Sequence, residues 1–465
     1  MSPSGSHTTM GAPRLRASRG SRWTPVARIA LPLLALAAAA RAPLASADDA
    51  LQIDFGTALK LADERNLDVA IYYERIAAAD AALAQARLLA VPTVRIGSAY
   101  DRHHGNIQEI SGVIDDVDRV SRFTGATASI DVDVASAIFA PLAARQSRDA
   151  VRASADVNRH QVLVDVASGY LRLLQARAEA QVIDAALERA NDLATLTSSY
   201  AQAGEGLVAD AQMAAVQPLV WQQRALSARE AVEAATANVA RLLHLEAGTA
   251  LEPIEQTIPT LELYDGSEQL GPLIERALHG RPEAEQLDAL HAAAEDELKA
   301  RRFGWFIPGV ALGYASGEFG GAPGSEIANT DHRDDLSLQI YWQFEGFGFG
   351  RHARIESDEA RLREVALQRD KLHDSIVAEV REAYASTRSR RGQLPLAEAA
   401  VEHAAEAYEL NRARIYDKQG LPLEALQAME ALATAELARV DALVAYDLAQ
   451  IRLHTVLGNP LEIQR

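Results

Sequence analysis

Two stretches of this sequence alternate apolar and polar residues directly after a long helical pattern that ends near a proline. The first is AVPTVRIGSAY, residues 90–100, and the second is FIPGVALGYAS, residues 306–316. Strict alternation over this length predicts a β-strand with one apolar and one polar side. The long helices around these strands use their own apolar residues to pack on one another. What covers the apolar side of the strands therefore decides the fold class.

The long helices carry a heptad pattern. Small or apolar residues recur at spacings of four and three from Val162 to Ala194, and in the same register from Ile376 to Tyr408, where Thr387 and Arg390 interrupt it. This period is typical of helices that supercoil around neighbours. Many of these residues are Ala or Gly, which lets helix axes approach closely. A helix over 144–200 would be about 85 Å long at 1.5 Å per residue, so we expect a curved wall of helices.

Matched features recur along the chain at an offset that drifts between 210 and 216 residues. The matched pairs are Val91-Pro92 with Ile307-Pro308, Tyr200-x-x-x-Gly204 with Tyr416-x-x-x-Gly420, and Leu243 with Leu457. The sequence therefore predicts two copies of one plan, residues 48–250 and 273–465, each running helix, strand, loop, strand, long helix, turn, long helix. Residues 251–272 are the predicted linker. Pro218 and Pro395 fall inside predicted helices and are expected to kink or break them.

The first 47 residues read as a secretory signal peptide. They contain six arginines and no acid, an apolar run of twelve residues from Ile29 to Ala40, and an Ala-x-Ala site that predicts cleavage after Ala47. The apolar run is shorter than the roughly 20 residues of a membrane-spanning helix. We therefore predict an exported protein that begins at residue 48.

Composition narrows the possible functions. The chain has no cysteine, so it can hold neither a disulfide nor a zinc-thiolate site. Without the signal peptide it carries 40 basic and 64 acidic residues, a net charge of −24 (40 minus 64), and no basic patch. Such a surface repels nucleic acid. No arrangement of nucleophile, base and orienting acid emerges, so we predict neither an enzyme nor a cofactor.

The apolar side of the strands is best covered by lipid. Four strands are predicted, and each has an apolar side and a polar side. The residues on the four apolar sides are Val94, Ile96 and Tyr100; Ala126 to Val134 in alternation; Val310, Leu312 and Tyr314; and Leu336 to Phe344 in alternation. Strands of about 9 to 11 residues with this pattern are typical of an outer-membrane barrel. Four strands cannot close a barrel, and open edges are not tolerated in lipid, so the chain must assemble with copies of itself.

The sequence resembles the outer membrane efflux proteins, the TolC-like outer membrane factors. The resemblance rests on FGTALKLADERNLDV near the predicted mature start, the helix-to-strand joints at Pro92 and Pro308, the Y-x-x-x-G helix tips, and the closing LHTVLGNP. It implies an α+β membrane protein: a homotrimer with a 12-stranded outer-membrane β-barrel, four strands per chain, continued by a long periplasmic α-helical barrel. It also implies two partners, a periplasmic adaptor and an inner-membrane transporter.

The resemblance also assigns the helix-turn-helix tips. Tyr200, Gly204 and Asp210 in the first copy, and Tyr416, Gly420 and Glu424 in the second, are expected at the periplasmic tips that meet the adaptor and constrict the entrance. Family members often have an acid six residues past the tip glycine, where Asp210 fits in the first copy and Leu426 stands in the second. Glycine suits a sharp turn that needs positive φ.

The expected function is an exit duct in the cell outer membrane that passively conducts small molecules, such as drugs or metal ions. Two alternatives stay open: the exit duct of a type I protein secretion system, and a soluble periplasmic coiled-coil scaffold or adaptor. A predicted outer loop carries His103, His104, Asp115, Asp116 and Asp118. We interpret it as a solvated loop rather than a cation site. The stretch FEGFGFG, residues 344–350, is predicted to be a turn at the barrel base.

Overall fold

The computed structural model describes residues 51–246, 249, 251–264, 266–342, 349–416 and 421–461. All of these belong to one compact unit, Ala50–Arg465. The predicted signal peptide, residues 1–47, lies outside the described residues. No helix in the described part of the chain is both long enough and apolar enough to cross a bilayer.

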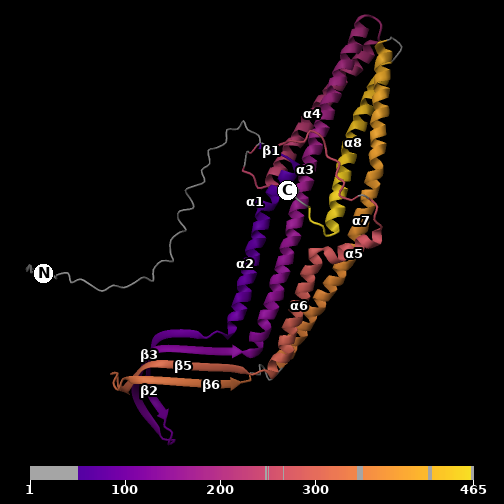
Figure 1. The fold of residues 1–465 in the computed structure, drawn as a ribbon. Helices are drawn as coiled ribbons and strands as arrows, with labels where there is room; N and C mark the ends of the chain where they lie inside the picture. Colours follow the sequence, from indigo (N-terminus) through magenta and orange to yellow (C-terminus); the bar gives the residue numbers. More distant parts are fainter. Residues whose placement is uncertain are drawn as a thin grey trace, which may run out of the picture. The chain divides into compact units, whose positions relative to one another are not determined.

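The structure consists mainly of long helices and one sheet of long strands (Figure 1). The helices are α1 (Phe55–Arg65), α2 (Leu67–Arg87), α3 (Val134–Gln202), α4 (Val208–Leu242), α5 (Leu270–Gly280), α6 (Pro282–Phe303), α7 (Phe349–Tyr416) and α8 (Pro422–Val456). The strands are β1 (Leu51–Ile53), β2 (Thr93–Gln108), β3 (Ile114–Asp133), β4 (Leu251–Pro253), β5 (Gly309–Pro323) and β6 (Asp331–Tyr341). Short 3₁₀ turns, η1 (Leu88–Ala90) and η2 (Gly304–Phe306), precede β2 and β5.

The helix expected before each strand pair is in fact two helices. Asn66 separates α1 from α2: its side chain accepts a hydrogen bond from the Asp68 amide at 2.8 Å and donates one to the Leu242 carbonyl at 3.1 Å. One amide thus caps the start of α2 and satisfies a carbonyl at the end of α4. In the second half, Pro282 at the first position of α6 makes the corresponding break.

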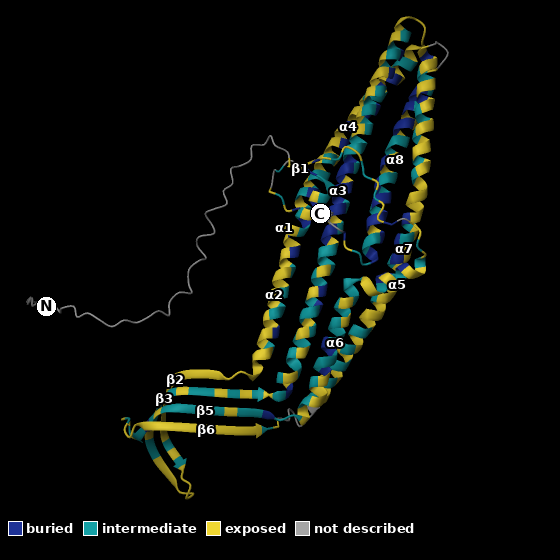
Figure 2. Ribbon diagram, viewed as in Figure 1, coloured by how far each residue is buried: buried dark blue, intermediate teal, exposed yellow. Residues whose placement is uncertain are grey.

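The helical core forms along α3, which packs on α2, α4, α6 and α8. Val162, Val166 and Leu173 of the heptad pattern are buried, and so are Leu163 and Tyr170 on the adjoining side of the helix. Burial on both sides follows because α3 has neighbours on both sides (Figure 2). A single heptad seam therefore describes only part of what α3 buries.

Thr387, which interrupts the pattern in the second half, is buried without an unpaired hydroxyl. Its Oγ1 donates to the Ala383 carbonyl at 2.9 Å and lies 3.1 Å from the Ala449 carbonyl on α8. Arg390 is exposed. The expected interruption is thus real at Arg390, whereas Thr387 is part of the α7–α8 contact.

Both prolines expected to disturb helices lie inside continuous ones. Pro218 is within α4 and Pro395 is within α7, and a third, Pro141, lies near the start of α3. Each lacks an amide hydrogen, so one backbone bond per site is lost. None of the three breaks its helix, because the packed turns on either side maintain the helical path.

The linker is more ordered than its sequence suggested. Residues Leu251–Pro253 form β4, which pairs in parallel with β1, and α5 begins at Leu270, inside the predicted linker. The Glu255 carboxylate accepts from the Phe55 amide at 2.8 Å and from the Tyr170 hydroxyl, which also donates to the Ile53 carbonyl at 2.8 Å. The linker and the first strand are therefore fixed to α3.

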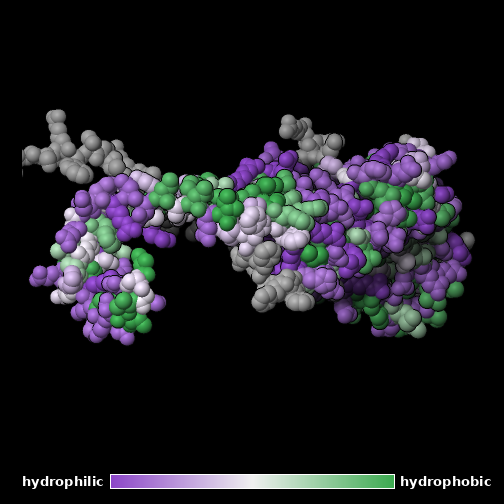
Figure 3. Space-filling model, turned by 90° about the horizontal axis from the view of Figure 1, so that it is seen from below, coloured by the Kyte–Doolittle hydropathy of each residue, from purple (hydrophilic) through white to green (hydrophobic). Residues whose placement is uncertain are grey.

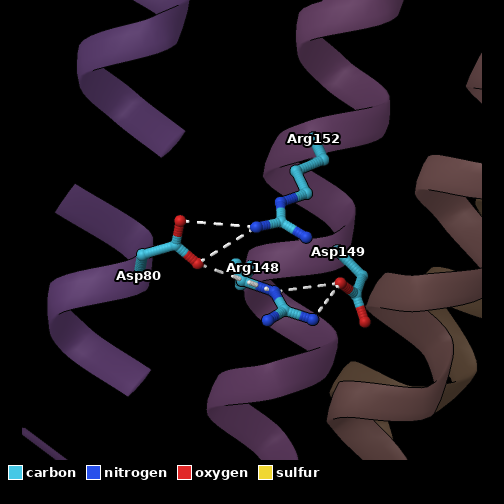
Figure 4. A network of polar contacts seen from close by, with 4 residues as sticks. All are labelled: Asp80, Arg148, Asp149 and Arg152. Atoms are coloured by element: carbon cyan, nitrogen blue, oxygen red, sulfur yellow. Dashed lines mark hydrogen bonds and ion pairs between the residues drawn. The ribbon is translucent and has the colours of Figure 1, made fainter. Parts of the chain in front are cut away.

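Ion pairs join α2 to α3 along an exposed surface (Figure 4). Arg152 contacts the two oxygens of Asp80 at 3.3 and 3.4 Å, and Arg148 lies 3.9 Å from the same carboxylate. Arg148 also pairs with Asp149 of its own helix at 2.6 Å. Exposed pairs contribute about 0–1 kcal/mol each. These pairs therefore add little to the stability of the fold.

Strands β2, β3, β5 and β6 form one antiparallel sheet in that order. The register places Ile130, Leu312 and Leu338 in one row, and the next row contains Val94, Ala128, Tyr314 and Leu336. Residues directly opposite share a side of the sheet, so all four apolar sides coincide. Ile96 is 81% exposed and Leu338 is 67% exposed, and hydrophobic surface runs along the strands (Figure 3). No other element of the described residues covers the apolar side of the sheet.

The strands of the first pair are longer than expected. β2 has 16 residues and β3 has 20, so His103, His104, Asp115, Asp116 and Asp118 lie in strands and the predicted outer loop is wrong. The apolar alternation ends where both sides become polar, yet the backbone ladder continues past that point. Most of the stretch 344–350 lies outside the described residues, and α7 begins at Phe349.

Candidate functional site

The tip between α3 and α4 is a tight turn built around Gly204. Its φ is +75°, in the left-handed region that favours glycine. The Tyr200 carbonyl accepts from the amides of Glu205 at 2.9 Å and Gly206 at 3.1 Å, and the Ala203 amide donates to Ser199 at 3.0 Å. These bonds satisfy carbonyls at the end of α3, as expected of a C-terminal glycine cap.

The second tip joins α7 to α8. Tyr416 ends α7 and Pro422 starts α8, while Gly420 lies outside the described residues. Pro422 occupies the first helical position, where its missing amide hydrogen costs no bond. The prediction for Gly420 therefore stays a prediction.

The two tips carry an acid at the same place in the helix. Asp210 is the third residue of α4, after Leu207 at the N-cap, and Glu424 is the third residue of α8, after Leu421 at the N-cap. The helix dipole favours a negative charge in this first turn. Leu426, the residue that fixed spacing matched to Asp210, is buried in a core cluster. The position in the helix, not the distance from the glycine, identifies the equivalent acid.

The tips of the two hairpins lie side by side, at the end of the helices remote from the sheet (Figure 1). The Tyr200 hydroxyl donates to the Tyr416 carbonyl at 3.4 Å. Behind it a buried cluster contains Trp221, Tyr408 and Met429, from α4, α7 and α8. Tyr200, Gly204, Asp210, Tyr416 and Glu424 are thus gathered in one region, and their role in contacting an adaptor stays a prediction.

Two arginine ion pairs, one in the hairpins and one at the second tip, were not anticipated. Arg189 of α3 makes a bidentate contact with Glu436 of α8, both N–O distances being 2.8 Å. The hydrogen bonds with Glu436 raise the pKa of the Arg189 guanidinium above its usual value. Arg414 pairs with Glu424 at 3.1 Å. Sequence could not single out these pairs, because their partners are up to 247 positions apart.

The helix-to-strand joints lie at the opposite end. Pro92 and Pro308 each stand directly before a strand, after η1 and η2 respectively. Both prolines exclude a backbone hydrogen bond donor and restrict the residue before them to extended geometry, which ends the helix. Exposed Trp305, Phe306 and Trp342 surround the second joint, and Arg351 lies over the Trp305 ring at 4.8 Å.

A hollow of about 1030 Å³ lies between the joints and the helices. It is lined by α2, α3, α6 and α7 together with Asp133, Gly309 and Tyr341 of the sheet. These three occupy one row of the register, on the polar side of the sheet. The Tyr341 hydroxyl donates to Asp131 on the same side at 2.7 Å. The polar side of the sheet and the hollow between the helices are therefore continuous.

The described residues contain no group of three or more metal-ligating side chains. Tip residues and joints are instead features of turn geometry, charge and packing. Such features suit a passage or a docking surface better than a reaction centre.

Comparisons with known proteins found one family match and several similar solved structures. Residues 273–459 match the family model described as "Outer membrane efflux protein". No curated protein shows a sequence match to the chain.

Solved structures share the fold across most of the chain. The outer-membrane channel OprN aligns with a TM-score of 0.75 at 18% identity, covering 87% of this chain and 90% of that one. VceC from Vibrio cholerae aligns with a TM-score of 0.74 at 18% identity, covering 88% and 97%. MtrE from Neisseria gonorrhoeae, described as an outer membrane channel in its open state, aligns with a TM-score of 0.68 at 17% identity, covering 88% and 90%. At this identity the likeness establishes the fold.

Proposed function

We propose that this chain is an outer membrane efflux protein and forms the outer-membrane exit duct of a tripartite efflux system, because residues 273–459 match the model of that family. The family is one of outer membrane channels, not of enzymes, and it places the chain in the outer membrane with its helices in the periplasm. In this proposal three copies assemble around one axis. An inner-membrane pump and a periplasmic adaptor deliver small molecules, such as drugs or metal ions, to the duct.

The observation that carries the proposal is the uncovered apolar side of the sheet. Ile96 and Leu336 are 81% and 75% exposed, and no helix or loop of the described chain covers them. In water this surface would drive aggregation, whereas in a bilayer it needs no protein cover. The soluble scaffold is disfavoured for the same reason.

The edges of the sheet argue for more than one copy. β2 and β6 each pair on one side only, which leaves a row of backbone groups open along both edge strands. In hydrocarbon each unpaired group costs several kcal/mol. Pairing β6 of one copy with β2 of the next satisfies both edges, and three copies of four strands give the twelve-stranded barrel that the family resemblance implies.

The polar side of the sheet would then line the duct. Asp131, Ser129 and Thr127 alternate on this side of β3, opposite the apolar Ile130 and Ala128. The hollow beside Asp133 and Tyr341 would continue the same aqueous passage between the helices. The apolar side of the sheet would thus contact lipid outside the barrel, and the polar side would contact water inside it.

We assign the hairpin tips to adaptor contact and to the periplasmic entrance. Asp210 and Glu424 stand at equivalent positions in adjacent hairpins, so a trimer would carry six acids around its axis. Such a ring would favour cations over anions at the entrance. Pro92 and Pro308 would mark the level at which periplasmic helices become membrane strands.

The direct test is the state of the protein purified from cells. We expect it in the outer-membrane fraction, as trimers in detergent that fall apart to monomers only on heating. In a lipid bilayer these trimers should conduct ions without a cofactor. Recovery as a water-soluble monomer in a periplasmic extract would contradict the proposal and favour the scaffold.

A further inference from the structure

A row of glycines crosses the sheet just beyond its apolar band. The register pairs Gly97 with Gly125 and Gly125 with Gly317, so three adjacent strands carry glycine at one level. This level is one residue beyond the pair Ile96 and Ala126. Glycine inside a strand weakens it, and it often marks a bend or a close approach of two backbones.

Two of the three glycines are required by close packing of the backbone. A Cβ on Gly125 would lie 2.3 Å from the Ser316 carbonyl oxygen and 2.7 Å from the Cα of Gly317. A Cβ on Gly317 would lie 2.5 Å from the Thr124 carbonyl oxygen. Among the described residues of one copy, no atom lies within 4 Å of a Cβ built on Gly97. The crowding is therefore a property of the β3–β5 crossing, not of the whole row.

The crowded side is the polar side of the sheet. Gly125 and Gly317 have the same parity along their strands as Ser129 and Gly313, which lie on that side. In a regular sheet a Cβ stands clear of the neighbouring backbone, so crowding on one side means that this side is concave. The sheet bends towards its polar side at the Gly125–Gly317 crossing.

Beyond the crossing, the β2–β3 hairpin (residues 98–124) continues further than the other strands. β5 follows β3 only as far as the pair Pro323 and Arg119, and the hairpin tip extends past it to Ile110. Figure 1 shows this end of β2 and β3 turning away from the line of the sheet, at the end remote from the helices. β5 stays paired with β3 from Gly317 to Pro323, so the hairpin becomes a two-stranded arm only beyond Arg119, six residues past the bend.

The arm is held from its other side by the connection between β5 and β6. The Gly324 amide donates to the Asp118 carbonyl at 2.8 Å, and the Gly321 amide donates to the Ala328 carbonyl at 2.9 Å. Val120 at the base of the arm is only 2% exposed. Within the arm, Arg102 binds both oxygens of Asp118, at 3.1 and 2.8 Å. These contacts indicate a fixed, bent arm.

The polar side of the sheet faces the duct in the function proposed above, and this inference depends on that orientation. We propose that the Gly125–Gly317 crossing turns the β2–β3 hairpin over the outer mouth of the duct, where the hairpin limits the size of solute that can leave. Gly125 and Gly317 act as positioning residues, and the hairpin forms the constriction. The outer end of the duct is then a second size filter, separate from the periplasmic entrance.

The first test locates the hairpin tips. The chain has no cysteine, so Ile110→Cys gives a single spin-labelling site per copy at the tip, and Ile340→Cys gives one on the barrel wall. Distances between labels are measured in reconstituted trimers. We expect shorter distances between tips than between wall sites. Tips that lie as far apart as the wall sites would overturn the proposal, because the arms would then point straight out.

The second test alters the bend. Gly125→Ala and Gly317→Ala each place a methyl group against backbone, whereas Gly97→Ala, in the same row, places one in open space. We expect the first two to lengthen the distances between Ile110 labels and the control to leave them unchanged. If the first two variants do not fold, the distances in the otherwise unaltered chain still decide the question.

The third test measures the mouth itself. Polyethylene glycols of graded size are added to the extracellular side of a single trimer in a bilayer, and polymers small enough to enter reduce the conductance. The largest polymer that enters should be larger in Gly125→Ala and Gly317→Ala than in Gly97→Ala. An unchanged limit in folded variants would contradict a size filter at the hairpin.

These tests separate the inference from the function on which it depends. If no trimer forms, the proposed duct fails. If conducting trimers form but the tips are far apart and the polymer limit is unchanged, the duct stands and the bent-hairpin filter fails.

Discussion

Asp447 of α8 is a fully buried carboxylate with a single hydrogen bond. Its Oδ1 accepts from the Leu261 amide of the linker at 2.8 Å, and its Oδ2 has no hydrogen-bond partner among the described residues. Burial raises the pKa of this carboxyl to about 7, and the Leu261 hydrogen bond only partly opposes the shift. The neighbouring Gln450 completes the contact by accepting from the Tyr264 amide at 2.8 Å.

The raised pKa of Asp447 predicts a specific dependence of stability on pH. In the unfolded chain the carboxyl ionises near 3.9, whereas in the folded chain it stays neutral up to about 7; its contribution to stability is therefore full below 3.9 and is lost as pH rises to about 7. The slope is at most about 1.4 kcal/mol per pH unit. Asp447→Asn stays neutral, keeps an acceptor for Leu261, and should therefore melt higher than the unaltered protein by a margin that grows from pH 5 to about pH 7 and then levels off.

Thermal unfolding in detergent at pH 5, 6, 7 and 8 measures that margin. Asp441→Asn is the matched control, since Asp441 lies on the same helix with an exposed contact to Gln175. A margin that stays constant across this range would show that Asp447 does not titrate as its burial requires.

Single residues also show where sequence patterns mislead. Leu426 looked like a missing acid because it stands six residues after Gly420, yet it is a core residue, and Glu424 occupies the helix position of Asp210. Gly204 stands four residues before the start of α4, whereas Gly420 stands two residues before the start of α8, so counting from the glycine shifts the match by two residues. Counting from the helix start depends only on capping geometry and would have found it.

At the scale of elements, alternation and heptad spacing predicted the type of every long element. They were less reliable for boundaries. β2 and β3 extend well beyond the alternating stretches, because only the lipid-facing part of a strand needs apolar residues on one side. The break at Asn66 was missed because the helical pattern runs through it, and only the side-chain cap marks the new helix.

The linker shows a second limit of prediction from sequence. Nothing in the sequence of residues 251–264 signals a strand, since β4 is three residues long and gains its partner β1 about 200 positions away. Pairings of this kind depend on the tertiary fold and leave no local pattern.

The helical tips provide a prediction at this scale. If Asp210 and Glu424 form an acidic ring at the entrance, Asp210→Asn combined with Glu424→Gln should lower the permeability ratio of potassium to chloride in reconstituted trimers, because the fixed negative charge is removed. Reversal potentials in a salt gradient give this ratio.

Glu233→Gln is the control for the tips, since Glu233 is an exposed acid of α4 far from the turn. It should leave the ratio unchanged. Equal loss of cation preference in Glu233→Gln and in the double variant would show that selectivity reflects the overall negative charge of the helices, not a ring at the tips.

At the scale of the whole molecule, the sequence predicted a membrane fold because the apolar sides of the strands lacked a covering layer of protein. Apolar faces on the strands had nothing in the chain to cover them, and the register confirms that all four lie on one side of the sheet. The continuous hollow on the opposite side was beyond prediction, because it depends on how four helices and the sheet meet at the joints. The Gly125–Gly317 crossing likewise emerges only when the strands are paired.

The central claim is that lipid covers the side bearing Ile96, Val132, Leu312 and Trp342. Single cysteines at these positions, spin-labelled in trimers reconstituted into vesicles, allow relaxation to be compared between dissolved oxygen and a water-soluble metal quencher. The account predicts high accessibility to oxygen and protection from the quencher at all four, and the reverse at Gln339 and Ser129 on the polar side. Labels at Ile96 and Leu312 that the quencher reaches while oxygen does not would contradict it.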